Sequence, residues 1–283
     1  MKVSRKLKWI GFLVLVFALG VLMFIDWGSS SFPVPQANGY DDFVHASAMV
    51  RGDLRDTYSD QQALEMYVSE NAGVYALAQS GLGKSSRVTV QTSRDWGTAH
   101  ANEVGRLKNL THCLIAKSRL AEMEGRTNEA FDVYLETYRF AHEMSAGGLA
   151  LDFLVGISCK ALVLDRFKAL IPNLTSPQRK EALRVIDSIE SEEEDAQVVH
   201  RRMRRWQNAA LGLRWRVERW RKTVEEIVQS RSLKPLGSSR RLLLDRLEIY
   251  EKQYINPIRD QLQRSQVTDP GTFPSAAKGP PSP

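Results

Sequence analysis

The stretch from Val104 to Met144, VGRLKNLTHCLIAKSRLAEMEGRTNEAFDVYLETYRFAHEM, decides the fold class of this chain. Its apolar residues recur at spacings of three, four and seven, which is the period of one face of an α-helix. Gly125-Arg126 interrupts the pattern with a turn, and Thr127 is a residue type that caps the start of a helix. The stretch therefore predicts a helical hairpin.

The same helical period continues on both sides of this hairpin. On the C-terminal side, Gly147-Gly148 ends the hairpin, and residues 149–171 are apolar on several sides, as expected for a helix at the centre of a core. On the N-terminal side, one helix follows Asp41, and another starts at Ser59 or Asp60 and ends near Gly81 and Gly83. Only residues 87–92, RVTVQT, alternate like a strand, and they are too short to make a sheet. We expect an all-α core domain over residues 41–175.

A heptad pattern begins at Ser176-Pro177, where a serine cap precedes a proline at the first helical position. Its apolar members follow one another in steps of three and four, with Glu192 as the one polar interruption: Ala182, Val185, Ile189, Ala196, Val199, Met203, Trp206, Ala210, Leu213, Val217, Trp220, Val224 and Ile227. This spacing predicts one long helix that packs along a narrow seam, like a coiled coil. A second seam over residues 243–254 predicts a helix that folds back on the first, interrupted or restarted at Asn256-Pro257. We expect a long helical hairpin over residues 176–265 and a disordered tail over residues 266–283.

Residues 9–27, WIGFLVLVFALGVLMFIDW, have the length and apolarity of a transmembrane helix. At a rise of ~1.5 Å per residue they span roughly 28 Å, close to the hydrocarbon thickness of a bilayer. Trp9 and Trp27 bracket the stretch at the positions where tryptophan prefers the membrane interface. The positive-inside rule predicts that residues 1–8 are a cytoplasmic basic flank and that the bulk of the chain lies on the periplasmic side. The alternative is a cleaved signal peptide, but no Ala-x-Ala site follows, and residues 28–40 are typical of a linker.

The formal net charge of the 283 residues is +6, and the flank over residues 1–8 contributes +4 of it. The remaining residues carry only +2, so a general basic footprint is absent and no nucleic acid is expected as a partner. Cys113 and Cys159 are the two cysteines, too few for a disulfide framework. Each lies in an apolar helical stretch and suits a small buried side chain, and one disulfide between them stays open if the compartment is oxidising.

Two motifs suggest chemistry without the context that the chemistry needs. Residues 78–85, AQSGLGKS, fit the loose pattern of a phosphate-binding loop, but a helical pattern precedes them where a buried strand is required. A helix that ends at glycine explains them better. His100 and Glu103 are three residues apart and could share a helix face, but the sequence contains no pair of ligands with metal-site spacing. We therefore assign no catalytic, cofactor-binding or metal-binding residue, and no cofactor.

Residues 200–222, HRRMRRWQNAALGLRWRVERWRK, form the sharpest local bias in the chain, with nine Lys/Arg, one acidic residue and three tryptophans. A basic amphipathic helix of this kind can contact anionic lipid headgroups. Two of the tryptophans lie on the heptad seam, however, and favour packing against a partner helix beneath a solvated basic face. The candidate interaction surface consists of Arg201, Arg202, Arg204, Arg205, Trp206, Trp215 and Trp220.

The hairpin over residues 110–144, with Ser118, Gly125-Arg126, Glu129-Ala130 and Tyr134, resembles a tetratricopeptide-type helical hairpin, although the Trp and the closing Pro of that pattern are missing. The arrangement over residues 1–190 also resembles a group of uncharacterised bacterial single-span membrane-anchored helical proteins. Its matching elements are the apolar anchor, Asn38-Gly-Tyr-Asp-Asp42, Gly125-Arg126, and Gly147-Gly148-Leu149 followed by Leu154-Val-Gly-Ile157. This second resemblance implies an anchored helical body and no particular activity.

Taken together, these patterns predict a membrane-anchored, non-catalytic helical scaffold or interaction protein of the cell envelope. Its partners would be the lipid bilayer and either another protein or a second copy of the chain along the heptad seam. Two alternatives stay open. One is an enzyme whose site lies among residues 95–165 of the helical core, and the other is peripheral binding of anionic lipid through residues 200–222.

Overall fold

The structure is a computed structural model of the chain, and it describes residues 33–52, 60–93, 95–212, 221 and 238–267. Within these residues the regular elements are helices and none is a strand, which confirms the predicted all-α class. The helices are α2 (Gly39–Met49), α3 (Gln61–Glu70), α4 (Ala72–Leu82), α5 (Trp96–Met123), α6 (Thr127–Glu143), α7 (Ala150–Leu170, extended by the 3-10 turn Ile171–Asn173), α8 (Ser176–Ser191), α9 (Ala196–Ala210), α11 (Ser238–Tyr250, followed by the π-helical segment Glu251–Ile255) and α12 (Asn256–Val267).

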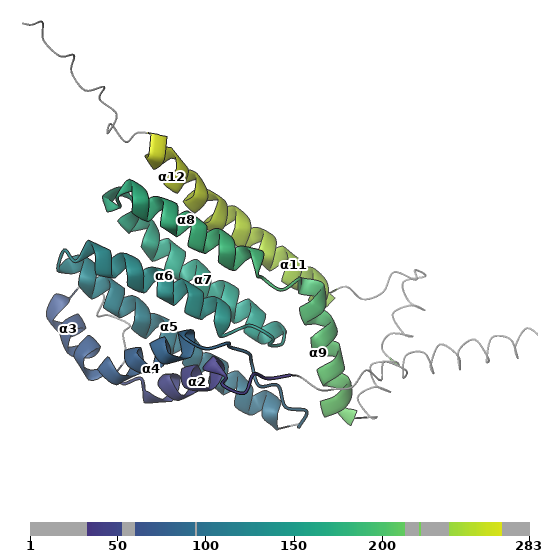
Figure 1. Cartoon of the computed structure of the whole chain (residues 1–283). Coiled ribbons are helices and arrows are strands. Elements are labelled where there is room, and N and C mark those ends of the chain that lie inside the picture. Colours follow the sequence, from purple (N-terminus) through teal and green to yellow (C-terminus); the bar gives the residue numbers. More distant parts are fainter. Residues whose placement is uncertain (1–32, 53–59, 94, 213–220, 222–237, 268–283) are drawn as a thin grey trace, which may run out of the picture.

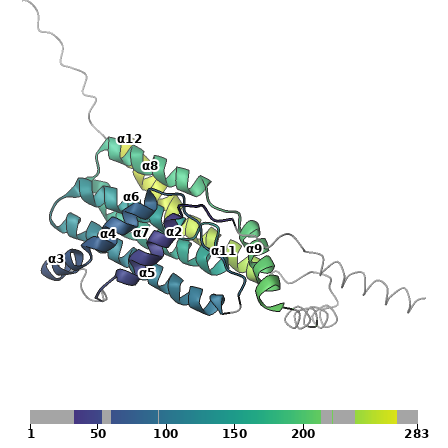
Figure 2. The same cartoon turned by 60° about the horizontal axis from the view of Figure 1, so that its bottom comes forward.

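The helices stack in layers around the predicted hairpin, which is formed by α5 and α6 (Figure 1). Gly125 makes the turn between these two helices in the left-handed region, at φ 72°. α7 packs against both helices of the hairpin, while α2, α3 and α4 cover one side and α8, α11 and α12 the other. α9 closes one end of the body, and α3 lies at the opposite end (Figure 2).

Two clusters of buried apolar side chains form the core. One cluster joins Phe43, Leu64 and Leu107 of the N-terminal half, and the ring of Phe43 meets that of Phe140 edge-on at 4.9 Å. The other joins Phe167 of α7 to side chains of α8 and α12. Residues from 41–175 and from 176–265 therefore share this second cluster.

Gly81 of the AQSGLGKS motif allows two helices to pack closely, together with Gly39 of the neighbouring helix. A Cβ on Gly39 would overlap the backbone oxygen of Gly81, and one on Gly81 would overlap the ring of Phe43. α2 and α4 can therefore cross at backbone contact only with glycine at both positions. Gly83 is the C-cap of α4, and Lys84 forms an ion pair with Asp42. The prediction of a helix that ends at glycine is confirmed.

The heptad pattern predicts one continuous helix from Ser176, and this prediction is wrong. α8 ends at Ser191, α9 begins at Ala196, and the break falls on the polar interruption at Glu192. The reason is the acidic run at residues 190–195, because like charges one turn apart destabilise a helix. Buried cations of neighbouring elements bind several of these carboxylates, as described below, and heptad spacing carries no information about such pairs.

The two ends of this region also differ in detail from the prediction. Thr175, and not Ser176, is the N-cap of α8, where it forms a capping box with Gln178. α9 ends at Ala210, and Gly212 follows in the left-handed region at φ 68°, where glycine commonly stops a helix.

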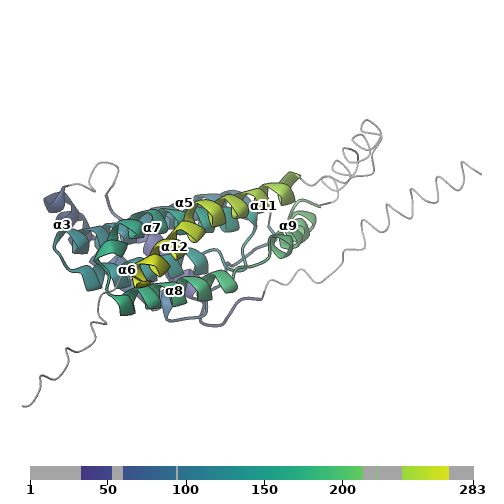
Figure 3. The same cartoon turned by 90° about the horizontal axis from the view of Figure 1, so that it is seen from above.

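The second helix folds back on the body, but the described residues do not form the single long hairpin that the sequence predicts over residues 176–265. α12 lies along α8, and α11 packs against α7 and α9 (Figure 3). The π-helical segment Glu251–Ile255 lies directly before Asn256-Pro257, as expected because proline lacks the N–H that would continue the α-helical ladder.

The predicted membrane span over residues 9–27 lies outside the described residues. The disordered tail is predicted to begin at residue 266, but α12 continues to Val267, and the rest of the predicted tail lies outside the described residues. In the part of the chain that the structure describes, no helix combines the length and apolarity needed to cross a bilayer.

Candidate functional site

The candidate interaction surface of the sequence analysis is divided by the structure into a buried and an exposed part. Arg201, Arg204 and Arg205 are exposed, Arg202 is buried, and Trp206 is half-buried. Trp215 and Trp220 lie outside the described residues. α9 is thus a helix with one face in solution and the opposite face fixed to the body.

Trp206 fixes the C-terminal half of α9 to the start of α5. Its indole ring packs on Trp96 at a centroid distance of 5.7 Å and lies over Gly97, where a Cβ would come within 3.2 Å of the ring. Its indole N–H donates a hydrogen bond to the carbonyl oxygen of Gln91 at 2.8 Å. The packing partner of Trp206 is therefore within the chain, but it is α5 and the preceding segment and not the second helix of the predicted hairpin.

Arg202 fixes the N-terminal half of α9. Its guanidinium forms a bidentate pair with Glu194 and also donates to the carbonyl oxygen of Gly148, at 2.6 Å from Nη1. The other face of the Glu194 carboxylate accepts the backbone N–H of Gly147 at 3.2 Å. Because its donors are occupied and its side chain is only 9% exposed, Arg202 does not belong to the exposed arginine face.

A buried polar cluster lies next to the contacts between α9 and the body. It is centred on His100, whose ring stacks on that of Trp96 at a centroid distance of 4.2 Å. The ring nitrogens are hydrogen-bonded on opposite sides, Nε2 to Asp152 at 2.7 Å and Nδ1 to Glu103 at 3.1 Å. Tyr40 donates its hydroxyl to the same Glu103 carboxylate at 2.6 Å. We call these four residues, Tyr40, His100, Glu103 and Asp152, the His100 cluster; it connects α2, α5 and α7.

The His100 cluster holds a positive charge between two carboxylates. Burial alone would lower the pKa of His100, but the hydrogen bonds to Asp152 and Glu103, and their negative charges, outweigh burial and raise it to about 9. For Glu103, burial works to raise the pKa, and the hydrogen bonds from His100 and Tyr40 bring it below its usual value. At neutral pH the ring is therefore an imidazolium, and both of its N–H groups donate.

A second buried cluster surrounds Lys160 of α7, whose side chain is 0% exposed. Its ammonium contacts Glu190 at 2.9 Å and Glu193 at 2.7 Å, and lies 5.1 Å from the centre of the Tyr250 ring. Tyr138 donates to Glu190 at 2.5 Å, and His142 contacts Glu193 at 3.1 Å. This Lys160 cluster connects α6 and α7 with α11 and with the residues where α8 ends, so it is a direct cause of the break in the heptad helix.

Neither cluster has the geometry of a metal site. The two carboxylates of the His100 cluster face opposite edges of one imidazole, and so they cannot converge on a single ion. Across the described residues, no group of three or more His, Cys, Asp or Glu side chains is arranged to hold a metal ion. Cys113 and Cys159 are both buried free thiols, and burial raises the pKa of each, to about 11 for Cys159.

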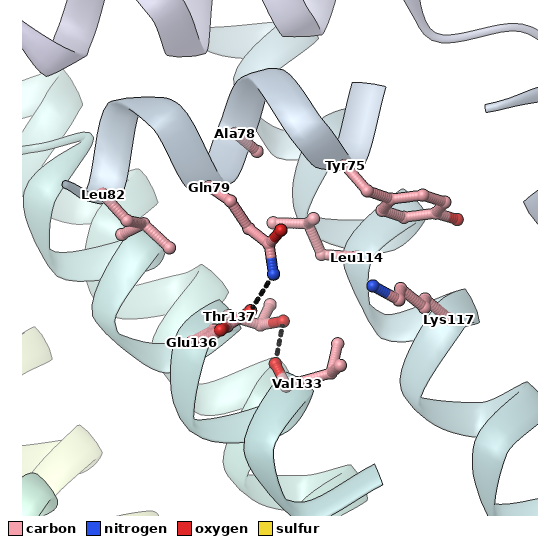
Figure 4. Close-up of a pocket in the computed structure, with 9 residues that line it drawn as sticks. All are labelled: Tyr75, Ala78, Gln79, Leu82, Leu114, Lys117, Val133, Glu136 and Thr137. Carbon is pink, nitrogen blue, oxygen red and sulfur yellow. Dashed lines mark hydrogen bonds between the residues drawn. The ribbon is translucent and has the colours of Figure 1, made fainter. Parts of the chain in front are cut away.

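A small pocket opens elsewhere, between α4, α5 and α6 (Figure 4). Gln79 crosses it to donate a hydrogen bond to Glu136 at 3.1 Å, and Lys117 lies 5.2 Å from the centre of the Tyr75 ring. The pocket has room for about one water molecule, and none of its lining residues belongs to either buried cluster.

Sequence reasoning identified part of this arrangement. His100 and Glu103 do share a helix face, as their spacing indicates, but Asp152 and Tyr40 approach from other helices and were missed. Lys160 was missed as well, although a lysine in the otherwise uncharged stretch of residues 153–164 is a detectable signal.

No protein-family model, no curated protein and no solved structure matches this chain significantly.

Proposed function

We propose that this chain is a non-catalytic interaction protein of the cell envelope. Residues 9–27 anchor it in the membrane, residues 1–8 lie in the cytoplasm, and the helical body lies on the periplasmic side. The support for the anchor is the sequence: an apolar stretch of spanning length, preceded by four basic residues and bracketed by Trp9 and Trp27.

The observation that carries the interaction role is the division of α9 into two faces. The polar groups of Arg202 and Trp206 donate hydrogen bonds to the body, and these bonds fix the orientation of α9. Arg201, Arg204 and Arg205 then project from the opposite face with no salt bridge to another described residue. A rigid helix whose guanidinium groups form no salt bridge within the described part of the chain suits recognition of an anionic partner, since little flexibility is lost when it binds.

The buried clusters support a structural role for the polar core. In both, a buried cation contacts two carboxylates, at least one of which comes from another part of the chain, and one glutamate also accepts a hydrogen bond from a tyrosine hydroxyl. Such groups define how helices pack when every partner is satisfied.

Photo-crosslinking in cells tests this proposal. A benzoylphenylalanine at Ala209, exposed beside the arginines, should form adducts that are lost in the Arg201→Glu, Arg204→Glu, Arg205→Glu variant. They should persist in the matched control Lys168→Glu, Lys180→Glu, Arg184→Glu, which changes three exposed cations near the start of α8. Equal crosslinking from Ala76 on α4 would argue against a specific face. A C-terminal alkaline phosphatase fusion tests the topology, because it is active only outside the cytoplasm.

An enzyme is the second candidate function, and one observation favours it. The buried His100 lies between the carboxylates of Asp152 and Glu103, residue types from which acid–base sites are built, and the Glu103 side chain is 24% exposed. A panel of ester, phosphate and peptide substrates would test it. Turnover that is abolished by His100→Gln at an unchanged melting temperature would favour catalysis over the structural role.

A further inference from the structure

α9 lies at the end of the body where the chain enters from its N-terminal segment. The Asn38 side chain donates to the carbonyl oxygen of Arg87 at 2.8 Å, and the Gly39 N–H donates to that of Ser85 at 3.0 Å. In the same segment, the carbonyl oxygen of Gln91 accepts the hydrogen bond from the Trp206 indole N–H. Residues 85–91 thus connect the entry point of the body with α9, and Figure 1 shows the first described residues running from α2 toward α9.

The predicted anchor holds this end of the body close to the bilayer. Ten residues lie between Trp27, at the end of the predicted span, and Asn38, which makes eleven steps along the chain. A fully extended chain covers at most ~3.6 Å per residue, so the entry point stays within about 40 Å of the membrane surface. α9 is therefore among the helices that are nearest to the tether.

The exposed face of α9 is positively charged without interruption. Arg201, Arg204 and Arg205 lie on one side of the helix, and no acidic residue occurs between Ala196 and Val217. Two acidic residues come just before α9. Glu194 is paired with Arg202, and Asp195 is the N-cap of α9, where its carboxylate accepts the N–H of Gln197 at 2.6 Å. The sequence that follows, LRWRVERWRK at residues 213–222, adds five basic residues and two tryptophans, a residue type enriched where proteins meet lipid headgroups.

We propose that the exposed arginine face of α9 binds the anionic phospholipid surface of the membrane in which the chain is anchored. This inference rests on the membrane anchor of the proposed function. Lipid is favoured over an acidic protein because the tether keeps the bilayer within reach of α9 at all times, which gives the headgroups a high effective concentration. Each arginine close to an anionic surface favours docking by about fivefold, so three arginines favour it by about 100-fold.

The test uses the full chain in lipid nanodiscs that contain phosphatidylcholine alone or phosphatidylcholine with phosphatidylglycerol. An environment-sensitive fluorophore is attached to Ala209→Cys, and in a parallel sample to Ala76→Cys on α4; the native Cys113 and Cys159 are buried and should not react. We expect phosphatidylglycerol to raise and blue-shift the emission of the label at position 209 alone. Salt at 0.5 M should remove the effect, because it screens the charges.

Two variants decide which residues are responsible. Arg201→Glu, Arg204→Glu, Arg205→Glu should abolish the response to phosphatidylglycerol, while Lys168→Glu, Lys180→Glu, Arg184→Glu should retain it. Circular dichroism of both variants confirms that the helices are intact.

The results that would overturn the inference are distinct. The same emission in both kinds of nanodisc would contradict lipid binding with the anchor intact. A response to soluble polyglutamate but not to phosphatidylglycerol would assign the face to an acidic protein instead. A chain that does not co-purify with the nanodiscs at all would contradict the anchor, and hence the proposed function on which the inference rests.

Discussion

Two buried charge clusters hold this molecule together, and they differ in how their partners are distributed. In the His100 cluster, the cation on α5 takes one carboxylate from its own helix, three residues away, and one from α7. In the Lys160 cluster, the cation on α7 takes one carboxylate from the last turn of α8 and one from the segment that follows it, 30 and 33 residues away. Each cluster is closed by a tyrosine hydroxyl that donates to a glutamate.

This difference explains why only one of the clusters lies at a break between two helices. Glu103 contacts its cation from a regular helix, because side chains three residues apart lie on one face. Glu190 and Glu193 must reach a buried ammonium on another helix, and α8 ends between them. The Lys160 cluster therefore stabilises a break in the heptad helix, whereas the His100 cluster stabilises the packing of continuous helices.

The largest expected effect follows from removing the lysine. Lys160→Met leaves two glutamates partly buried without their cation, and losing one partner of a buried ion pair typically costs about 3–5 kcal/mol. We expect a loss of this size in the free energy of unfolding, measured by circular dichroism in urea. Lys168→Met, on the exposed side of the same helix, should change it by less than about 0.5 kcal/mol. Equal effects of the two substitutions would mean that the Lys160 cluster does not stabilise the fold.

The next effect should come from alkaline pH and should be specific to the His100 cluster. The folded pKa of His100 is raised to about 9 from 6.5, so its contribution to stability is fully present below about pH 6.5 and is lost as pH rises through 9. The loss is about 3 kcal/mol at 1.36 kcal/mol per pKa unit. Unfolding free energies measured between pH 6 and 10 should show it, and His100→Gln should be less stable at pH 6.5 and flatter above it. An unchanged slope in His100→Gln would contradict the assignment.

At acid pH, the stability of the protein should change with pH in the opposite direction. The folded pKa values of Glu103 and Glu193 both lie below 4.5, where hydrogen bonds and cations overcome the effect of burial. Their contributions are present above about pH 4.5 and are lost as pH falls through the lowered values. Stability should therefore be greatest between about pH 5 and pH 6.5.

The sequence predicts the fold class because apolar spacing is a local property. The period of residues 104–144 is enough to define α5 and α6, and Gly83 and Asp60 end or cap helices as expected. Breaks within helices are harder to predict, since they depend on distant partners. Residues 61–82 form two helices because the Asn71 side chain accepts the N–H of Arg51 at 2.9 Å and donates to its carbonyl oxygen at 3.1 Å.

The candidate site was predictable only in part, for the same reason. Composition identifies the basic helix, but it does not separate Arg202, which pairs with Glu194 and Gly148, from its exposed neighbours. Gly97 looks unremarkable in the sequence, and its role appears only when Trp206 lies over it. Contacts between residues about 50 to 110 positions apart leave no periodic signal in a single sequence.

A smaller effect should separate the tyrosines of the two clusters. Tyr40→Phe removes the hydroxyl that donates to Glu103 at 2.6 Å, and we expect it to cost about 2 kcal/mol, as for hydrogen bonds to charged groups. Tyr250→Phe should cost only about 1 kcal/mol, because Tyr138 still donates to Glu190 at 2.5 Å. Urea titrations of both variants under one set of conditions provide the measurement. A larger loss for Tyr250→Phe would show that Tyr250 is the principal donor to Glu190.

The smallest effect on stability should come from the exposed face of α9. Arg201→Glu, Arg204→Glu, Arg205→Glu breaks no salt bridge to a described residue, so we expect the melting temperature of the body to change by about 2 °C or less. Trp206→Ala, in contrast, removes the contacts with Trp96 and Gln91 and should lower it clearly. If the arginine variant were as destabilised as Trp206→Ala, the three arginines would be part of the packing and could not present a free binding face. A stable arginine variant makes any loss of binding attributable to the charges themselves, because the helix that carries them is still in place.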